Sequence, residues 1–227
     1  MIEKEISARI ASLEAVNTKL AGYTDRLEAV LEIMNLQSRF SLWQELGYYE
    51  RIWEELFSHK NPGVKCEIGE SGVYEGPESV KRLWMALAGQ KRQRGYMAND
   101  FLMDPYIVIG SDNITAKGLW WIFGTHSDHA TPSPGDLQRL TANWIAGKYD
   151  NEFVKEKGKW KLLSLHNIIY FRTPYDQGWF KEPNCARWQA PEGVLPDKTS
   201  TYSDLYHPDG ICLWGPGAYP YEPLIKP

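Results

Sequence analysis

His166 is the side chain whose surroundings most directly suggest acid–base chemistry. It lies in the apolar stretch "KWKLLSLHNIIYF" (159–171), which predicts the second strand of a hairpin. An imidazole changes charge near neutral pH, so it can both accept and donate a proton. Strand alternation predicts that His166 shares a face with Trp160 and Tyr170. If that face lines a cavity, His166 is a candidate proton shuttle; if it does not, His166 is a packed core residue.

Two other histidines have the spacing of metal ligands but no third ligand nearby. His126 and His129 flank Asp128 in "GTHSDHATPSPGD", a segment whose Pro, Ser and Gly content predicts a loop. A metal site needs three or four converging donors. The chain also has no glycine-rich phosphate loop, no nucleophile elbow and no HExxH motif. We therefore expect neither a metal nor any other cofactor.

The composition argues against several classes of protein. The 227 residues carry a net charge of −4, so no basic surface for nucleic acid is expected. No apolar run approaches the roughly 20 residues that span a bilayer, and the acidic N-terminus does not resemble a signal peptide. The three cysteines are scattered, which predicts reduced thiols. We expect a soluble cytoplasmic protein with no membrane or nucleic-acid partner.

Aromatic residues are the unusual part of the composition. The 10 Trp, 13 Tyr and 7 Phe residues make up 13% of the chain. Such side chains combine a large apolar area with a polar group in Trp and Tyr. They predict either a heavily aromatic core or a cavity lined by aromatic rings, and composition alone does not separate the two.

The first 34 residues carry a heptad pattern that predicts a long helical extension. Its two apolar series, interrupted only by Arg9, are Ile6, Leu13, Leu20, Leu27 and Met34, and Ile2, Val16, Tyr23 and Val30. This apolar seam pairs either with another subunit or with the surface of its own domain. We expect a homo-oligomer, a dimer or a trimer.

The patterns that follow predict an α+β domain. The helical pattern continues to Gly47, a typical terminator. Shorter elements come next: a helix at 48–57, a strand near 64–68, a brief strand near 73–76 and a helix at 77–88. Four long strand candidates then run to residue 173, and we expect them to form a curved antiparallel sheet.

The last segment, 174–227, differs in composition from the rest of the chain. It holds nine of the 14 prolines, interleaved with Tyr and Trp, and shows no periodic pattern. Proline disfavours regular elements, whereas aromatic residues are depleted in disordered chains. We expect an irregular arm that packs onto the domain or onto a neighbour.

Three strings between residues 27 and 171 resemble the SnoaL-like branch of the nuclear transport factor 2-like superfamily. They are "LQSRFSLWQELGYYERIWEELF", "GVYEGPESVKRLW" and "GKYDNEFVKEKGKWKLLSLH". In that group an arginine–aromatic pair precedes an acidic residue on a helix, a Gly-x-Tyr-x-Gly step enters the third helix, and a Gly-x-Trp-x turn closes a hairpin. The resemblance implies a SnoaL-like domain over 27–173, built as a cone-shaped curved antiparallel sheet closed by helices around an apolar pocket.

The resemblance also implies a class of reaction. Ketosteroid isomerase, scytalone dehydratase, bile acid dehydratase, aromatic polyketide cyclases and diarylpropane lyases belong to this superfamily, and many members move protons on hydrophobic molecules without a cofactor. We therefore expect a cofactor-independent lyase (a dehydratase or deformylase) or an isomerase, acting on a small aromatic or polycyclic alcohol or ketone. Fold does not settle function. A non-catalytic ligand-binding or assembly subunit and an aromatic polyketide cyclase stay open as alternatives.

Two carboxylates are candidates for the base that such chemistry needs. In the dehydratases the first helix carries a tyrosine and, five residues later, an aspartate; the matching residues here are Phe40 and Glu45. Asp100 lies close to the position of the dehydratase histidine, with Asn99 and Asp104 as alternatives. Both predicted bases, Glu45 and Asp100, are equally compatible with structural roles.

The predicted acid is His166, acting together with Tyr49 on the departing oxygen. The predicted substrate-binding residues are aromatic, because an aromatic cage suits a planar or polycyclic ligand. They are Phe40, Trp43, Trp121, Trp144, Tyr149 and Tyr170. Tyr149 matches the family tyrosine only loosely, since Asp150 follows it one position early, and a structural pairing of these two residues is the alternative.

Overall fold

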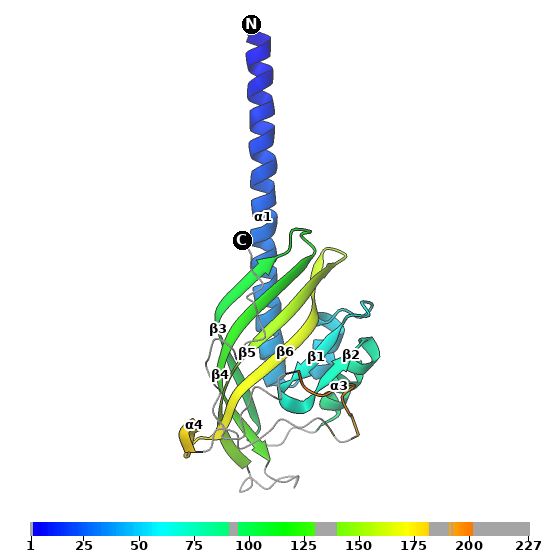
Figure 1. Cartoon of the computed structure of the whole chain (residues 1–227), viewed down its shortest axis with the longest axis vertical. Coiled ribbons are helices and arrows are strands. Elements are labelled where there is room, and N and C mark those ends of the chain that lie inside the picture. The colour runs from blue at the N-terminus through cyan, green and yellow to red at the C-terminus, as the bar shows by residue number, and fades with distance from the viewer. Residues whose placement is uncertain (1, 91–94, 130–139, 182–190, 192, 202–227) are drawn as a thin grey trace.

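The fold was taken from a computed structural model that describes residues 2–90, 95–129, 140–181, 191 and 193–201 (Figure 1). Its helices are α1 (Ile2–Leu46), α2 (Tyr49–Arg51), α3 (Pro77–Gly89) and α4 (Gly178–Lys181), with a π-helical turn at Ile52–Leu56 after α2. Its strands are β1 (Lys65–Ile68), β2 (Val73–Glu75), β3 (Met97–Ile109), β4 (Thr115–His129), β5 (Leu140–Glu156) and β6 (Lys159–Pro174). None of the described helices has a segment long and apolar enough to cross a membrane.

The six strands form one open, curved sheet in the order β2-β1-β6-β5-β4-β3 (Figure 1). The long strands β3 to β6 pair antiparallel through successive hairpins. The short strand β1 pairs parallel with β6. The predicted α+β class and curved sheet are confirmed, with the correction that one pair of strands is parallel.

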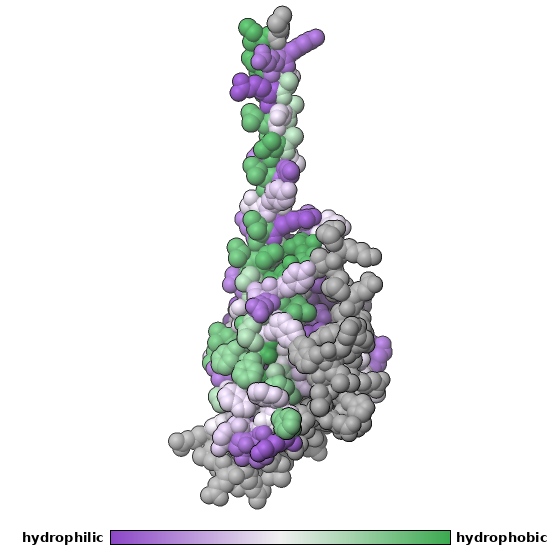
Figure 2. All heavy atoms as spheres, turned by 60° about the vertical axis from the view of Figure 1, so that its left-hand side comes forward, coloured by the Kyte–Doolittle hydropathy of each residue, from purple (hydrophilic) through white to green (hydrophobic). Residues whose placement is uncertain are grey.

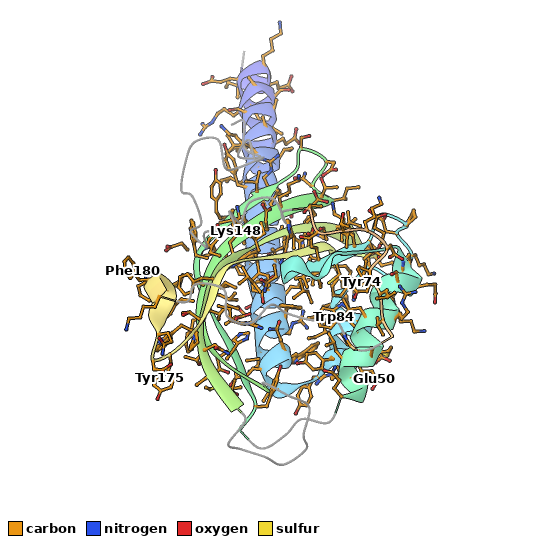
Figure 3. All side chains as sticks on the ribbon, turned by 60° about the horizontal axis from the view of Figure 1, so that its bottom comes forward. Glu50, Tyr74, Trp84, Lys148, Tyr175 and Phe180 are labelled. Carbon is orange, nitrogen blue, oxygen red and sulfur yellow. The ribbon has the colours of Figure 1, made fainter. Side chains whose placement is uncertain are left out.

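The helices α1, α2 and α3 cover one face of the sheet, here called the inner face, and the main core lies between these helices and the sheet; α4 lies beside β6, away from this core (Figures 1 and 3). α1 crosses this face against β3 and β6, and Phe40 of α1 packs edge-on against both Trp84 and Tyr149, with ring centroids 5.8 and 5.6 Å apart. In Figure 3, Trp84 lies inside the domain, whereas Phe180 of α4 points away from it. Much of the unusual aromatic content therefore forms the core.

Two β-bulges decide which side chains of β6 reach the inner face. The register of β6 against β5 shifts near Phe153 and again near Gly147. As a result Trp160 belongs to the main core, whereas Tyr170 packs with Trp121 in a second cluster on the opposite, outer face. The prediction that Trp160 and Tyr170 share a face is wrong, because the bulge near Phe153 inserts one residue into β6 between them and so reverses the alternation.

Gly124 allows β3 and β4 to approach closely. It pairs with Asp100, and a Cβ atom at position 124 would overlap the backbone carbonyl of Asn99. We expect Gly124→Ala to lower the free energy of unfolding by about 1–3 kcal/mol, as overpacking does, measured by urea denaturation. Gly22→Ala is the control, because a Cβ atom there meets nothing within 4 Å. Equal stability of the two variants would contradict this explanation.

Residues 193–201 of the predicted arm pack on β2 and α3. Lys198 forms a backbone bridge with Val73, and the Tyr74 hydroxyl donates a hydrogen bond of 2.8 Å to the carbonyl of Val194. The Asp197 carboxylate accepts a hydrogen bond of 2.8 Å from the backbone N–H of Glu75. The rest of the predicted arm beyond α4, at 182–190, 192 and 202–227, lies outside the described residues.

Candidate active site

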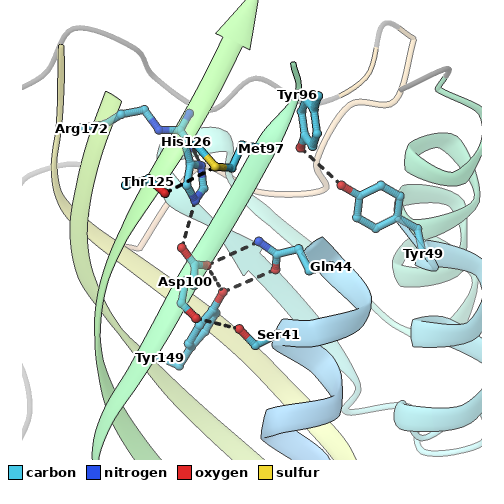
Figure 4. A network of polar contacts seen from close by, with 10 residues as sticks. All are labelled: Ser41, Gln44, Tyr49, Tyr96, Met97, Asp100, Thr125, His126, Tyr149 and Arg172. Atoms are coloured by element: carbon cyan, nitrogen blue, oxygen red, sulfur yellow. Dashed lines mark hydrogen bonds and ion pairs between the residues drawn. The ribbon is translucent and has the colours of Figure 1, made fainter. Parts of the chain in front are cut away.

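Asp100 is the centre of a buried polar network on the inner face (Figure 4). Its Oδ1 atom lies 2.9 Å from Nε2 of His126. Its Oδ2 atom accepts a hydrogen bond of 2.7 Å from the Tyr149 hydroxyl and a longer one of 3.4 Å from the Gln44 amide. Ser41 donates to the backbone carbonyl of Asp100 at 2.9 Å. Only 1% of the Asp100 side chain and 7% of the His126 side chain are exposed.

Each of the four long strands contributes one residue to this network. They are Asp100 of β3, His126 of β4, Tyr149 of β5 and Arg172 of β6. Asp100 pairs with Gly124, so His126 lies two residues further along the same face of β4.

The contacts of His126 define its protonation. The Nη2 atom of Arg172 lies 2.9 Å from Nδ1 of His126. A guanidinium has only donors, so Nδ1 must accept. The single proton of the neutral ring is therefore on Nε2, where it is donated to Asp100. His126 is held as a neutral imidazole with its lone pair on Nδ1.

The Asp100 carboxyl is held in its ionised form. Burial raises its pKa, but the hydrogen bonds that the carboxylate receives from His126 and from the Tyr149 hydroxyl lower it by more. The charge of Arg172 acts in the same direction. The pKa of Asp100 consequently lies below the ordinary aspartate value, so Asp100 is a weak base that fixes the orientation of His126.

The Tyr149 phenol stays protonated at any ordinary pH. Burial, then the charge of Asp100 and the hydrogen bond to it, raise the Tyr149 pKa well above its usual value. The phenol is thus a fixed hydrogen-bond donor on the inner face. Two more phenols, Tyr49 and Tyr96, lie on the α2 side of the network with their hydroxyl oxygens 3.4 Å apart (Figure 4).

Removing the Tyr149 hydroxyl tests how firmly the carboxylate is held. We expect Tyr149→Phe to lower the free energy of unfolding by about 1.5–3 kcal/mol, the range for a hydrogen bond to a charged group. Urea denaturation at neutral pH measures the change. Tyr106→Phe, at an exposed position of β3, is the matched control, and an equal effect of the two substitutions would contradict the assigned contact.

The predicted acid–base residues fall into two groups. Asp100 and Tyr49 lie on the inner face, whereas Glu45 is exposed near the end of α1, one residue after Gln44. His166 is on the outer face, where its Nε2 atom lies 3.4 Å from the Glu67 carboxylate. Burial lowers the pKa of His166, although the charge of Glu67 opposes this. His166 and Asp100 are thus on opposite sides of the sheet.

The predicted substrate-binding aromatics divide in the same way. Phe40, Trp43 and Tyr149 belong to the main core between the helices and the inner face. Trp121 and Tyr170 form the outer cluster, and Trp144 stacks on Phe123 with ring centroids 5.5 Å apart. In the regular β4–β5 pairing these outer residues alternate with Trp120 and Tyr149, so they lie on the opposite face from Asp100.

Four residues of this network were not predicted from the sequence: Ser41, Gln44, His126 and Arg172. His126 was placed in a loop, but β4 continues to His129, which makes the loop interpretation wrong for His126. Alternation along β4 was the available signal, because Trp120, Ile122 and His126 share its inner face. Among the described residues, no group of three His, Cys, Asp or Glu side chains is arranged to hold a metal ion.

Comparison with known proteins gives the family and the fold. Residues 25–166 match the family model of the SnoaL-like domain. A candidate scytalone dehydratase from Novosphingobium aromaticivorans DSM 12444 is 14% identical, with a TM-score of 0.51 over 73% of this chain and 98% of that one. Hexachlorocyclohexane dehydrochlorinase LinA-type3 from Novosphingobium barchaimii LL02 is 17% identical, with a TM-score of 0.51 over 66% and 92%. No curated protein matches the sequence. The family match covers more than half of the chain, so the protein belongs to the SnoaL-like domain family.

Proposed function

We propose that the protein is a cofactor-independent lyase in which His126 removes a proton from a carbon atom of a small hydrophobic substrate. The observation that carries this proposal is the buried hydrogen bond between the ionised Asp100 and the neutral His126. A carboxylate that fixes one ring nitrogen of a histidine leaves the other nitrogen as the base and stabilises the imidazolium that forms.

Arg172 and the phenol groups supply hydrogen-bond donors for the substrate oxygen. Arg172 donates a hydrogen bond to Nδ1 of His126. In the proposed complex the substrate C–H bond takes that place, and the guanidinium turns to the substrate oxygen. Tyr49 and Tyr96 offer hydroxyl groups beside the network. Donors directed at an oxygen that gains charge stabilise the transition state.

The proposed reaction is the loss of water from a β-hydroxyketone. The proton on the carbon next to the carbonyl goes to Nδ1 of His126, and its electron pair forms the carbon–carbon double bond. The protonated His126 then gives this proton to the hydroxyl group, which leaves as water, and the ring returns to its neutral form. Within this family the proposed substrate is a small aromatic or polycyclic compound.

The test uses a substrate whose dehydration can be seen directly. The aldol of benzaldehyde and acetone loses water to give a conjugated enone, which absorbs ultraviolet light. The same sample in deuterated water reports exchange of the hydrogens next to the carbonyl by NMR. A β-hydroxyketone built on the tetralin ring system serves as the polycyclic probe.

We expect faster exchange or enone formation with the wild-type protein than with His126→Gln. Binding of the probes without exchange would instead favour a ligand-binding protein. Equal rates for the wild-type protein and His126→Gln with both probes would contradict the proposal.

A further inference from the structure

The N-terminal part of α1 extends beyond the domain as a free-standing helix (Figure 1). The first buried residue of α1 is Ala29. Before it, the apolar residues of the helix are between 51% and 73% exposed: Ile2, Ile6, Ile10, Leu13, Val16, Leu20, Tyr23 and Leu27. In Figure 2 these apolar side chains run along the projecting helix above the domain.

Such a helix requires a partner. An isolated helix gains little stability in water from its backbone alone and depends on packing of its apolar face. The spacing of the exposed residues is that of a heptad repeat, in which the a and d positions of one helix pack into those of another. Here the a positions are Ile6, Leu13, Leu20 and Leu27, and the d positions are Ile2, Arg9, Val16 and Tyr23. The seam is thus suited to a second copy of itself.

We propose that residues 2–27 of two chains pair as an antiparallel coiled coil. Charged residues beside the seam favour this orientation. Glu5 and Arg26 both occupy g positions, and g positions face each other only when the helices are antiparallel. An alignment that sets Glu5 of each copy opposite Arg26 of the other therefore gives two ion pairs.

A parallel pair would be unfavourable at the same positions. It would bring the two Arg9 side chains together in one layer of the seam, where like charges repel. It would also set Glu5 beside Ile10 and Arg26 beside Leu31 of the other copy, which offer no opposite charge. In the antiparallel alignment the two Arg9 residues are roughly 16 Å apart along the axis, at a rise of about 1.5 Å per residue.

The domain end of the projecting helix is compatible with this alignment. When Glu5 faces Arg26, the seam pairs Ile6 with Tyr23, Leu13 with Val16, Leu20 with Arg9, and Leu27 with Ile2 of the other copy. The paired segment stops two residues before Ala29, where the helix enters its own domain. The two domains would lie at opposite ends of a coiled coil roughly 40 Å long.

Molar mass in solution is the first test. Light scattering coupled to size-exclusion chromatography is expected to give twice the mass of the chain for the wild-type protein. The double variant Leu13→Ser with Leu20→Ser is expected to be monomeric, with unchanged near-ultraviolet circular dichroism of the domain. The control is Ala11→Ser with Thr18→Ser, which changes two exposed positions on the opposite side of the helix and is expected to stay dimeric.

Cysteine cross-linking tests the orientation. Ile6→Cys and Tyr23→Cys are made as separate proteins with different mass tags, in a background where Cys185 and Cys212 are replaced by Ser; Cys66 is buried. Oxidation of the mixture is expected to join Ile6→Cys to Tyr23→Cys, while neither variant cross-links with itself. Self-cross-linking of Ile6→Cys would overturn the antiparallel orientation. A monomeric wild-type protein, or a dimer that survives Leu13→Ser with Leu20→Ser, would overturn the interface.

Discussion

Replacing His126 with glutamine is expected to lower the rate of proton removal by about 10²–10⁴-fold, the usual contribution of a general base. Glutamine can still donate to Asp100 but has no lone pair of comparable basicity. The measurement is deuterium exchange of the benzaldehyde–acetone aldol, with the enzyme saturated so that kcat is compared. Because the reaction step is affected, we expect KM to change much less than kcat.

His166→Gln is the control for this substitution. It makes the same chemical change in the same sheet, but on the outer face beside Glu67. We expect this variant to keep the exchange activity of the wild-type protein. If His166→Gln lost the activity and His126→Gln kept it, the active site would lie on the outer face of the sheet instead.

Asp100→Asn is expected to have the largest effect on stability. The substitution removes the buried negative charge that binds His126, with Arg172 on the far side of that ring, and breaking a buried pair in this way costs about 3–5 kcal/mol. Since Asn keeps the shape and one acceptor, we expect a loss near the lower end. Activity is expected to fall as well, because the amide can donate to His126 and thereby favour the other tautomer.

Asp104→Asn is the matched control, because Asp104 is an exposed residue of the same strand. Its backbone has a φ of 49°, a conformation that Asn adopts as readily as Asp. We expect its stability to remain that of the wild-type protein. An equally small effect at Asp100 would mean that the buried charge is not structurally important.

The stabilising effect of Asp100 is expected to depend on pH. The folded-state pKa lies below the ordinary value, so the unfolded chain takes up a proton first as the pH falls. The stabilisation is therefore complete above about pH 5 and is lost as the pH falls from the unfolded value of about 3.9 through the folded pKa. Urea denaturation of the wild-type protein and Asp100→Asn should converge over this range. A constant difference down to the acid transition would contradict the ionised state.

The elements of the fold were largely predictable from sequence because their signals are local. The heptads of α1, the Pro at the start of α3 and the alternation in β4 to β6 depend on nearby residues only. Asp100 was found from its resemblance to a dehydratase position. Arg172 was missed, because its contact with His126 joins two strands that are 46 residues apart in the chain.

The side of the sheet on which a residue lies was the hardest feature to predict. Simple alternation placed His166 with Trp160, but the register shift of β6 near Phe153 puts them on opposite faces. A bulge leaves no clear mark in a single sequence, since it needs only one residue in a different backbone conformation. A β-strand that is apolar on both faces also has no polar face that would reveal a wrong assignment of its residues.

The protonation of the His126 ring tests the central claim most directly. A nitrogen–proton correlation spectrum of the histidine side chains identifies which ring nitrogen carries the proton, and His126→Gln assigns the signal. At neutral pH we expect the His126 proton on Nε2 and a lone pair on Nδ1 in the wild-type protein. A proton on Nδ1, or on both nitrogens, would contradict the proposal that Asp100 and Arg172 keep the lone pair of His126 on Nδ1, where it acts as the base.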